Sequence, residues 1–298
     1  MSQRHHSELF GDGRLHLRHG RLDLVVEAID EPVAVRRAYL QAEAAFDGLS
    51  ARLDQELTLL RRPVDAQPPA LSGPVARRML LAVWPHRRVY VTPMAALAGA
   101  VADQVMAAMI DGLSPRQAYI NIGGDIALYL APGERFRIGL AAALTGETRA
   151  VPEFLGVTEI DAAQAVRGIA TSGRGGGGLS LGIADAVTVL AADAAAADAA
   201  ATLIANAVDV DHPAILRAPA REVVADSDLG LLPVTVAVGP LPPDAVADAL
   251  AAGATLAESM RRAGLIAAAA LSLASEVAVV GPLGLESAAT AGDTWTGP

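Results

Sequence analysis

Asp198 and Thr202 have the residue types and the spacing of a metal-binding pair. They lie four positions apart in an alanine-rich stretch that predicts a helix, so both oxygens project from one helical face. A carboxylate and a hydroxyl placed in this way can supply two oxygens to Mg²⁺, which keeps its remaining positions for carbonyls, water and phosphate. The alternative is that Asp198 only makes an otherwise apolar helix more polar.

A glycine-rich segment at 171–178, TSGRGGGG, precedes this helix. Consecutive N–H groups in such a loop can form an anion-binding concavity, and the guanidinium of Arg174 suits phosphate. The segment is neither a P-loop nor a dinucleotide-binding fingerprint, because it lacks the Gly-Lys ending and no helix follows it directly. We expect phosphate contacts from Thr171, Ser172, Gly173 and Arg174; a flexible surface loop is the alternative.

The segment NIGGDI at 121–126 is a second candidate for ligand contact. Two glycines after a strand let the backbone approach a ligand closely or adopt a positive φ, and Asp125 adds a carboxylate. The residues expected at the ligand are Asn121, Gly123, Gly124 and Asp125. The alternative is a hairpin turn with a solvated aspartate.

The composition limits the class of protein. The chain has 298 residues, of which 52% are hydrophobic and 19% charged, with a net charge of −10 and no cysteine. These values predict a globular protein without thiolate chemistry or a broad nucleic-acid surface, while an anionic small ligand stays compatible with them. The longest apolar run, 263–274, is too short to span a bilayer, so we expect a cytoplasmic protein with no membrane partner.

The elements that position these residues mix strands and helices without a strict βαβ rhythm, which predicts an α+β fold. We expect one domain at 14–284 between a flexible N-terminus at 1–13 and a loose tail at 285–298. Strands are expected at 14–29 (two, around Gly20), 118–130 (two, split at Gly123), 135–142, 184–190, 222–224, 234–238 and 277–280, and helices at 31–60, 93–111, 193–208 and 244–262.

Four motifs occur together in order: TPMAALAGAVAD at 92–103, NIGGDI at 121–126, ATSG at 170–173 and ADAAAT at 197–202. In order and spacing they resemble the ApbE family of Mg-dependent FAD:protein FMN transferases, which have a single α+β fold related to the T-fold. The resemblance implies that Asp198 and Thr202 bind Mg²⁺ together with a backbone carbonyl near Ala95. It also implies that the GGD and TSG turns line a pocket for FAD or a related nucleotide.

The chain departs from the family pattern at three places. Ala98-Gly99 stands where the transferases carry Lys-Gly, and Thr92 stands where they carry an acidic residue. The segment LGIADAV at 181–187 has Asp185 but neither the His nor the Pro of the family's His-x-x-Asp-Pro segment. The resemblance therefore implies the fold and a phosphate-plus-metal site of a divergent branch, while FMN transfer carries over poorly.

The expected function is binding of a flavin or nucleotide phosphate with Mg²⁺, with transfer to an unknown acceptor as one outcome. A non-catalytic ligand-binding or assembly protein on the same fold is an alternative, and a different enzyme acting on a phosphorylated small molecule is another, because fold alone does not decide function. The alanine-rich helices suit close helix packing, so the sequence is also compatible with a homodimer.

Overall fold

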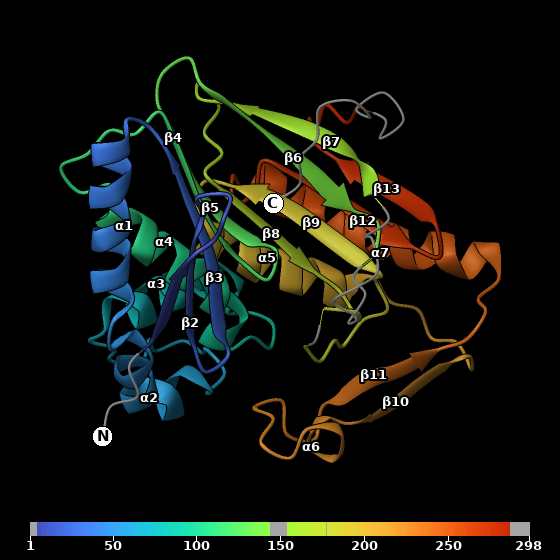
Figure 1. The fold of residues 1–298 in the computed structure, drawn as a ribbon. Helices are drawn as coiled ribbons and strands as arrows, with labels where there is room; N and C mark the ends of the chain where they lie inside the picture. The colour runs from blue at the N-terminus through green and yellow to red at the C-terminus, as the bar shows by residue number, and fades with distance from the viewer. Residues whose placement is uncertain (1–4, 144–153, 177, 287–298) are drawn as a thin grey trace. The chain divides into compact units, whose positions relative to one another are not determined.

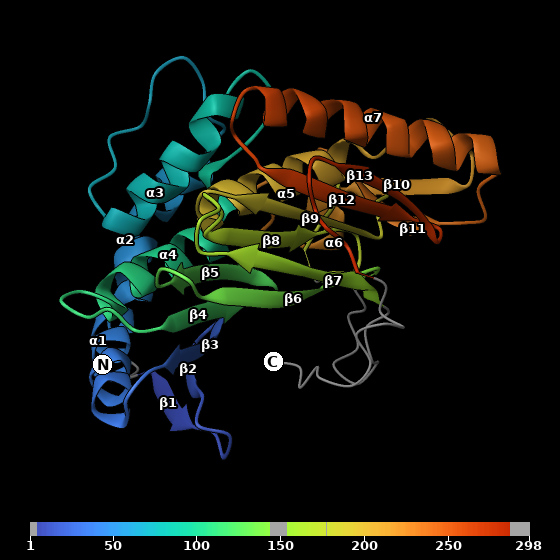
Figure 2. The same ribbon diagram turned by 90° about the horizontal axis from the view of Figure 1, so that it is seen from above.

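The computed structural model describes residues 5–143, 154–176 and 178–286, and its residues group into two compact units. Unit one comprises 1–136, 161–170 and 191–199; unit two comprises 137–160, 171–190 and 200–298. Figures 1 and 2 show the elements of each unit. Strand β8 (Gly168–Ser172) and helix α5 (Ala194–Ala207) each contribute residues to both units.

Unit one contains an antiparallel sheet whose strands alternate between buried and exposed side chains. In β3, Leu22, Leu24 and Val26 are buried while the residues between them are more exposed, as a sheet with one covered face requires. The two predicted strand pairs, around Gly20 and around Gly123, are confirmed. The strands, in order across the sheet, are β1 (His6–Leu9), β2 (Leu15–His19), β3 (Leu22–Ile29), β4 (Gln117–Ile122), β5 (Asp125–Leu130) and the first residues of β8 (Gly168–Ser172).

Helices of unit one cover the sheet, with α1 and α4 packed on strands β3 to β5 (Figure 1). The prediction of one helix over 31–60 is wrong. Gly48 has φ 65°, a left-handed conformation that cannot continue an α-helix, and it separates two helices. The helices are α1 (Pro32–Phe46), α2 (Leu49–Leu60), α3 (Pro74–Val83), η1 (Trp84–His86), η2 (Pro93–Ala96) and α4 (Leu97–Met109).

Unit two is built around two strands whose side chains are buried at every position, β9 (Ala186–Ala191) and β12 (Ala268–Leu273). Such strands are covered on both faces and lose the alternation that reveals a half-buried strand, so the apolar run at 263–274 did not predict β12. Helix α7 packs on β12 and β13 (Figure 2). The remaining elements are β6 (Arg135–Ala141), β7 (Phe154–Asp161), α5 (Ala194–Ala207), β10 (Ile215–Pro219), α6 (Ala220–Val223), β11 (Pro233–Val238), α7 (Pro243–Arg262) and β13 (Glu276–Val280).

The α+β class is confirmed, and so are the helices predicted at 93–111, 193–208 and 244–262, within a few residues at their ends. The strand predicted at 222–224 is wrong, because the chain forms the short helix α6 there, after strand β10. Residues 6–9, within the stretch expected to be flexible, form β1. Most of the predicted loose tail lies outside the described residues.

Candidate functional site: two helix N-termini capped by carboxylates

Helices α4 and α5 cap each other through two aspartates. Asp198 of α5 accepts a hydrogen bond from the backbone N–H of Gly99 in the first turn of α4, with N and Oδ2 3.0 Å apart. In return, the carboxylate of Asp103 on α4 accepts from Ala194 N at 3.0 Å and Ala195 N at 2.9 Å, at the start of α5. Each carboxylate thus satisfies free N–H groups and faces the positive end of a helix dipole.

This arrangement depends on close backbone approach at two glycines. A Cβ added to Gly99 would lie 2.2 Å from the carbonyl oxygen of Ala194, and one added to Gly168 would lie 2.0 Å from the backbone of Asp193. No side chain fits at such distances. The glycine of the Ala98-Gly99 pair is therefore required by packing, whatever ligand the helix terminus meets.

Burial disfavours the ionised form of both carboxylates. It raises the pKa of Asp198 to about 7, although the N–H groups of Gly99 and Ala98 favour the charged form, and the nearby charge of Asp103 raises it further. Burial likewise raises the pKa of Asp103 to about 6, against the N–H groups that it accepts from. A nearby cation stabilises the charged form of two carboxylates in one low-dielectric region. None of the described basic side chains pairs with Asp198.

The predicted metal ligands lie close to this helix pair in the chain. Ala95 belongs to η2, two residues before the first residue of α4, and Thr202 follows Asp198 by one turn on α5. Both Asp198 and Thr202 are partly exposed. In the described residues, no group of three or more His, Cys, Asp or Glu is placed to hold a metal, so a Mg²⁺ site here would combine one carboxylate with hydroxyl, carbonyl and ligand oxygens.

The predicted GGD site is a tight hairpin turn between β4 and β5, in unit one. Gly123 and Gly124 have φ of 62° and 108°, and the side chain of Asn121 accepts a hydrogen bond from Gly124 N at 2.9 Å. Asn121 is therefore committed to holding the turn, and the partly exposed Asp125 begins β5. Ligand contact at this turn stays a prediction.

The predicted TSG segment ends strand β8 in unit two. The hydroxyls of Thr171 and Thr188 are hydrogen-bonded at 2.9 Å. A Cβ on Gly173 would lie 2.5 Å from the carbonyl oxygen of Asp185, so the turn packs tightly against the start of β9. Of the loop that follows, Gly177 lies outside the described residues.

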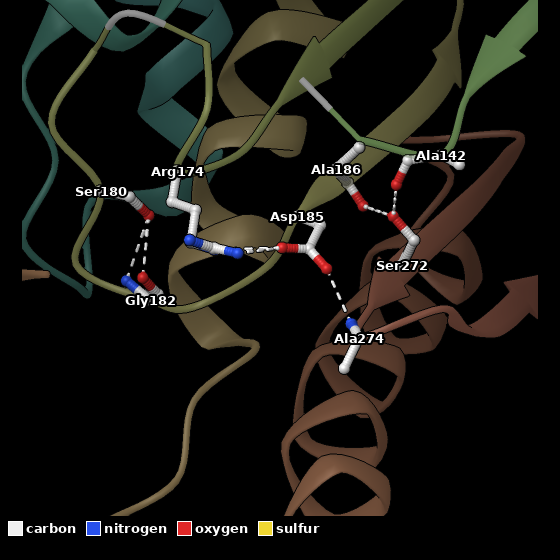
Figure 3. Close-up of polar contacts among 8 residues, drawn as sticks. All are labelled: Ala142, Arg174, Ser180, Gly182, Asp185, Ala186, Ser272 and Ala274. Carbon is white, nitrogen blue, oxygen red and sulfur yellow. Dashed lines mark hydrogen bonds and ion pairs between the residues drawn. The ribbon is translucent and has the colours of Figure 1, made fainter. Parts of the chain in front are cut away.

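Arg174 faces a carboxylate of its own unit. Its guanidinium donates to Oδ1 of Asp185 from Nε at 3.0 Å and from Nη2 at 2.7 Å, and the other oxygen of Asp185 accepts from Ala274 N at 2.7 Å (Figure 3). Asp185 thus joins the glycine loop to the turn after β12. A phosphate bound by Arg174 would have to compete with this ion pair.

The sequence alone did not assign roles to Asp103 and Asp185, whose carboxylates hold these segments together. Asp103 closes the motif at 92–103, and its position three to four residues from Gly99 and Ala100 on a predicted helix was a usable signal. Asp103 contacts the first turn of α5, and Ala194 in that turn lies 91 residues further along the chain. No local pattern encodes such a contact.

The structure thus defines a class of protein: an α+β protein in which paired aspartates cap the N-termini of two helices. Residues 7–279 match the model of the family described as AbpE bacteria, so the chain belongs to that family. Its membership in the ApbE-like superfamily, expected from the four motifs, is confirmed. No helix in the described part of the chain is both long and apolar enough to cross a membrane.

Three similar proteins are between 13% and 32% identical to this chain where the sequences align. The UPF0280 protein of Methanothrix thermoacetophila is 32% identical over 189 residues, which cover 62% of this chain and 70% of that protein. The flavin transferase ApbE of Vibrio cholerae is 14% identical, with 92% of this chain and 97% of that chain covered and a TM-score of 0.42. The flavinyl transferase ApbE of Pseudomonas stutzeri, in its apo form, is 13% identical with 94% and 95% covered and a TM-score of 0.40.

Proposed function

We propose that the chain binds a flavin or another nucleotide through its phosphates together with Mg²⁺, with Asp198, Thr202 and the carbonyl of Ala95 as the protein's metal ligands. The observation that carries this proposal is Asp198 itself. It is a partly exposed carboxylate with a raised pKa, oriented by Gly99 N, and it has no basic partner among the described side chains. A bound cation would stabilise its charged form.

The chain's own groups would each have a separate task. The backbone N–H groups of Gly99 and Ala98 orient the carboxylate of Asp198, while Asp103 keeps the start of α5 in place. The turn at 123–125 and the residues Thr171, Ser172, Gly173 and Arg174 would contact the flavin or nucleotide. When bound, Mg²⁺ would neutralise the charge of the ligand phosphates.

Transfer of FMN to a protein is one outcome of such binding, and binding without catalysis is the other candidate. Two observations favour the second. The 298 residues contain no lysine, so no other lysine can replace the one that the transferases carry at the position of Ala98. The guanidinium of Arg174, the cation of the glycine loop, is engaged by Asp185. A different reaction on a phosphorylated small molecule is compatible with the same groups.

Calorimetric titration of Mg²⁺ with and without FAD tests the metal site. Asp198→Asn keeps an oxygen that can accept from Gly99 N–H but removes the negative charge. We expect this variant to bind Mg²⁺ in the presence of FAD at least about tenfold more weakly than the unchanged protein. Nucleotide should strengthen metal binding, because a Mg²⁺ site with few protein ligands is completed by phosphate.

Asp248→Asn is the control, since it makes the same chemical change at an exposed position of α7 outside the candidate site and should leave Mg²⁺ affinity within about twofold. Circular dichroism verifies that both variants are folded. The proposal is wrong if Asp198→Asn binds Mg²⁺ and FAD as tightly as the unchanged protein. The same titration with ADP separates recognition of the flavin from recognition of the phosphates.

A further inference from the structure

Two surfaces that the proposed function does not use are opposite in charge, and both expose apolar side chains. One, which we call the basic face, consists of exposed residues of α3 and of the segment after η1 in unit one: Arg77, Leu81, Arg87, Arg88 and Val89. The other, which we call the acidic arm, consists of residues 209–240 in unit two, with β10, α6 and β11. Neither surface contains a residue of the candidate site.

The basic face concentrates positive charge in a chain whose net charge is −10. Residues 61–90 contain six arginines and a single acidic residue, Asp65. Arg77 and Leu81 lie one turn apart on α3 and so share a face of that helix; Leu81 is 71% exposed and Val89 57%.

Two of these arginines are available for an external partner. The guanidinium of Arg87 lies 4.7 Å from the centre of the Trp84 ring and donates to the carbonyl oxygen of Trp84 at 2.9 Å, which holds it in place. In the part of the chain that the structure describes, neither Arg87 nor Arg88 forms an ion pair with an acidic side chain. No described acidic side chain therefore compensates the charges of these two arginines.

The acidic arm has the complementary properties. It contains five acidic residues and two arginines. The pair of Asp209 and Arg217 is internal to the arm, whereas Glu222 and Asp226 are exposed and, over the described ranges, form no ion pair. The exposed large apolar side chains of the arm are Leu216, Val223, Val224, Leu231 and Val236.

The acidic arm is built on a two-stranded hairpin. Among the described strands, β10 and β11 pair only with each other and form a two-stranded sheet of their own (Figure 1). Thr235 N donates to the carbonyl oxygen of Ser180 at 2.9 Å and ties the hairpin to the rest of its unit. A two-stranded hairpin with exposed apolar side chains is marginally stable by itself and gains from a covering surface.

We propose that the acidic arm of one copy of this chain docks on the basic face of a second copy, so that two chains form a dimer with two equivalent contacts. The arm offers carboxylates for Arg87 and Arg88 and apolar side chains for Leu81 and Val89. A nucleic acid would meet the arginines but would leave the two apolar side chains without a partner. A dimer with two equivalent contacts of this kind has two-fold symmetry.

Charge reversal tests the contact in the full chain. We expect the unchanged protein to sediment as a dimer whose dissociation constant rises with salt. Arg87→Glu with Arg88→Glu, and separately Glu222→Arg with Asp226→Arg, should each weaken dimerisation at least about tenfold, because like charges then face each other. An equimolar mixture of the two variants should restore the dimer, since both contacts in the mixed pair again join opposite charges.

The control is Arg36→Glu with Arg37→Glu, which makes the same charge change at two exposed positions of α1 and should leave the dimer intact. A monomeric unchanged protein overturns the proposal, and so does a mixture that stays monomeric. A monomer that binds single-stranded nucleic acid through Arg87 and Arg88 would also overturn it and would assign the basic face to a different partner.

Disulfide trapping gives an independent readout, because the chain has no cysteine of its own. Leu81→Cys chains mixed with Val223→Cys chains should form a disulfide-linked pair on mild oxidation. The control mixture uses Val33→Cys, at an 83% exposed position on α1, with the same Val223→Cys partner. Equal yields of the two cross-links would count against the contact, since random collision would explain both.

Discussion

Gly99 is a residue at which packing leaves no room for a side chain. Its Cβ would lie 2.2 Å from the carbonyl oxygen of Ala194, which is backbone and cannot rotate away. Alanine gains about 1 kcal/mol of helix propensity over glycine, but overpacking of this kind costs about 1–3 kcal/mol or more. Because the contact is with backbone, we expect the upper end of this cost, so that Gly99→Ala lowers the free energy of unfolding by a net amount of about 2 kcal/mol in urea denaturation. Gly11→Ala is the control, because no atom lies within 4 Å of its added Cβ, and an equal effect of the two changes would contradict the packing argument.

Helices α4 and α5 are coupled by their exchanged caps, and this coupling has a pH dependence. Burial raises the pKa of Asp103 from 3.8 to about 6. The folded protein therefore binds this proton more tightly than the unfolded chain, and the stability from the protonated carboxyl is lost as pH rises through that range. We expect the unfolding free energy of the unchanged protein, relative to Asp103→Asn, to fall by on the order of 2 kcal/mol between about pH 4 and pH 7. Urea denaturation at a series of pH values measures this difference. A difference that stays constant or rises with pH would show that burial does not raise the pKa of Asp103 in the folded protein.

For the whole molecule, family membership and catalytic activity are separate questions. We expect FAD-dependent flavinylation of a protein acceptor to be absent or very slow. Transfer needs groups that orient FAD and stabilise developing charge, and each lost group of that kind costs about 10²–10³ in rate. The chain lacks any lysine, and the segment at 181–187 has no histidine. The measurement is fluorescence of covalently bound FMN on a peptide that carries a flavinylation motif, with and without Mg²⁺.

If the protein does transfer FMN, a variant of Arg174 tests which group replaces the missing cation. Robust Mg²⁺-dependent labelling would refute the expectation of a lost activity. Loss of that labelling in Arg174→Ala would then identify Arg174 as the replacement cation, released from Asp185 when ligand binds. Asp185→Asn is the informative companion, because it weakens the ion pair and leaves the guanidinium in place.

Local patterns in the sequence determined the turn at Gly123-Gly124, helix α7 and the class of fold. A double glycine between alternating strands and a long amphipathic run act through neighbouring residues, so they can be read without the rest of the chain. Asp198 was predicted as a metal ligand in the same way, from its spacing to Thr202 and from the motif at 197–202, and that role stays a prediction. These features depend on contacts within a few positions along the chain.

Only the tertiary structure decided where the carboxylates point. The caps exchanged by Asp103 and Asp198 and the ion pair of Arg174 with Asp185 join segments whose meeting depends on how the elements pack. Tertiary burial also made β12 a strand covered on both faces, which erased its alternation, and Gly48 took a left-handed conformation that split a predicted helix. A sequence pattern records local preference, whereas hydrogen bonds between distant segments and burial are set by the packing of the folded chain.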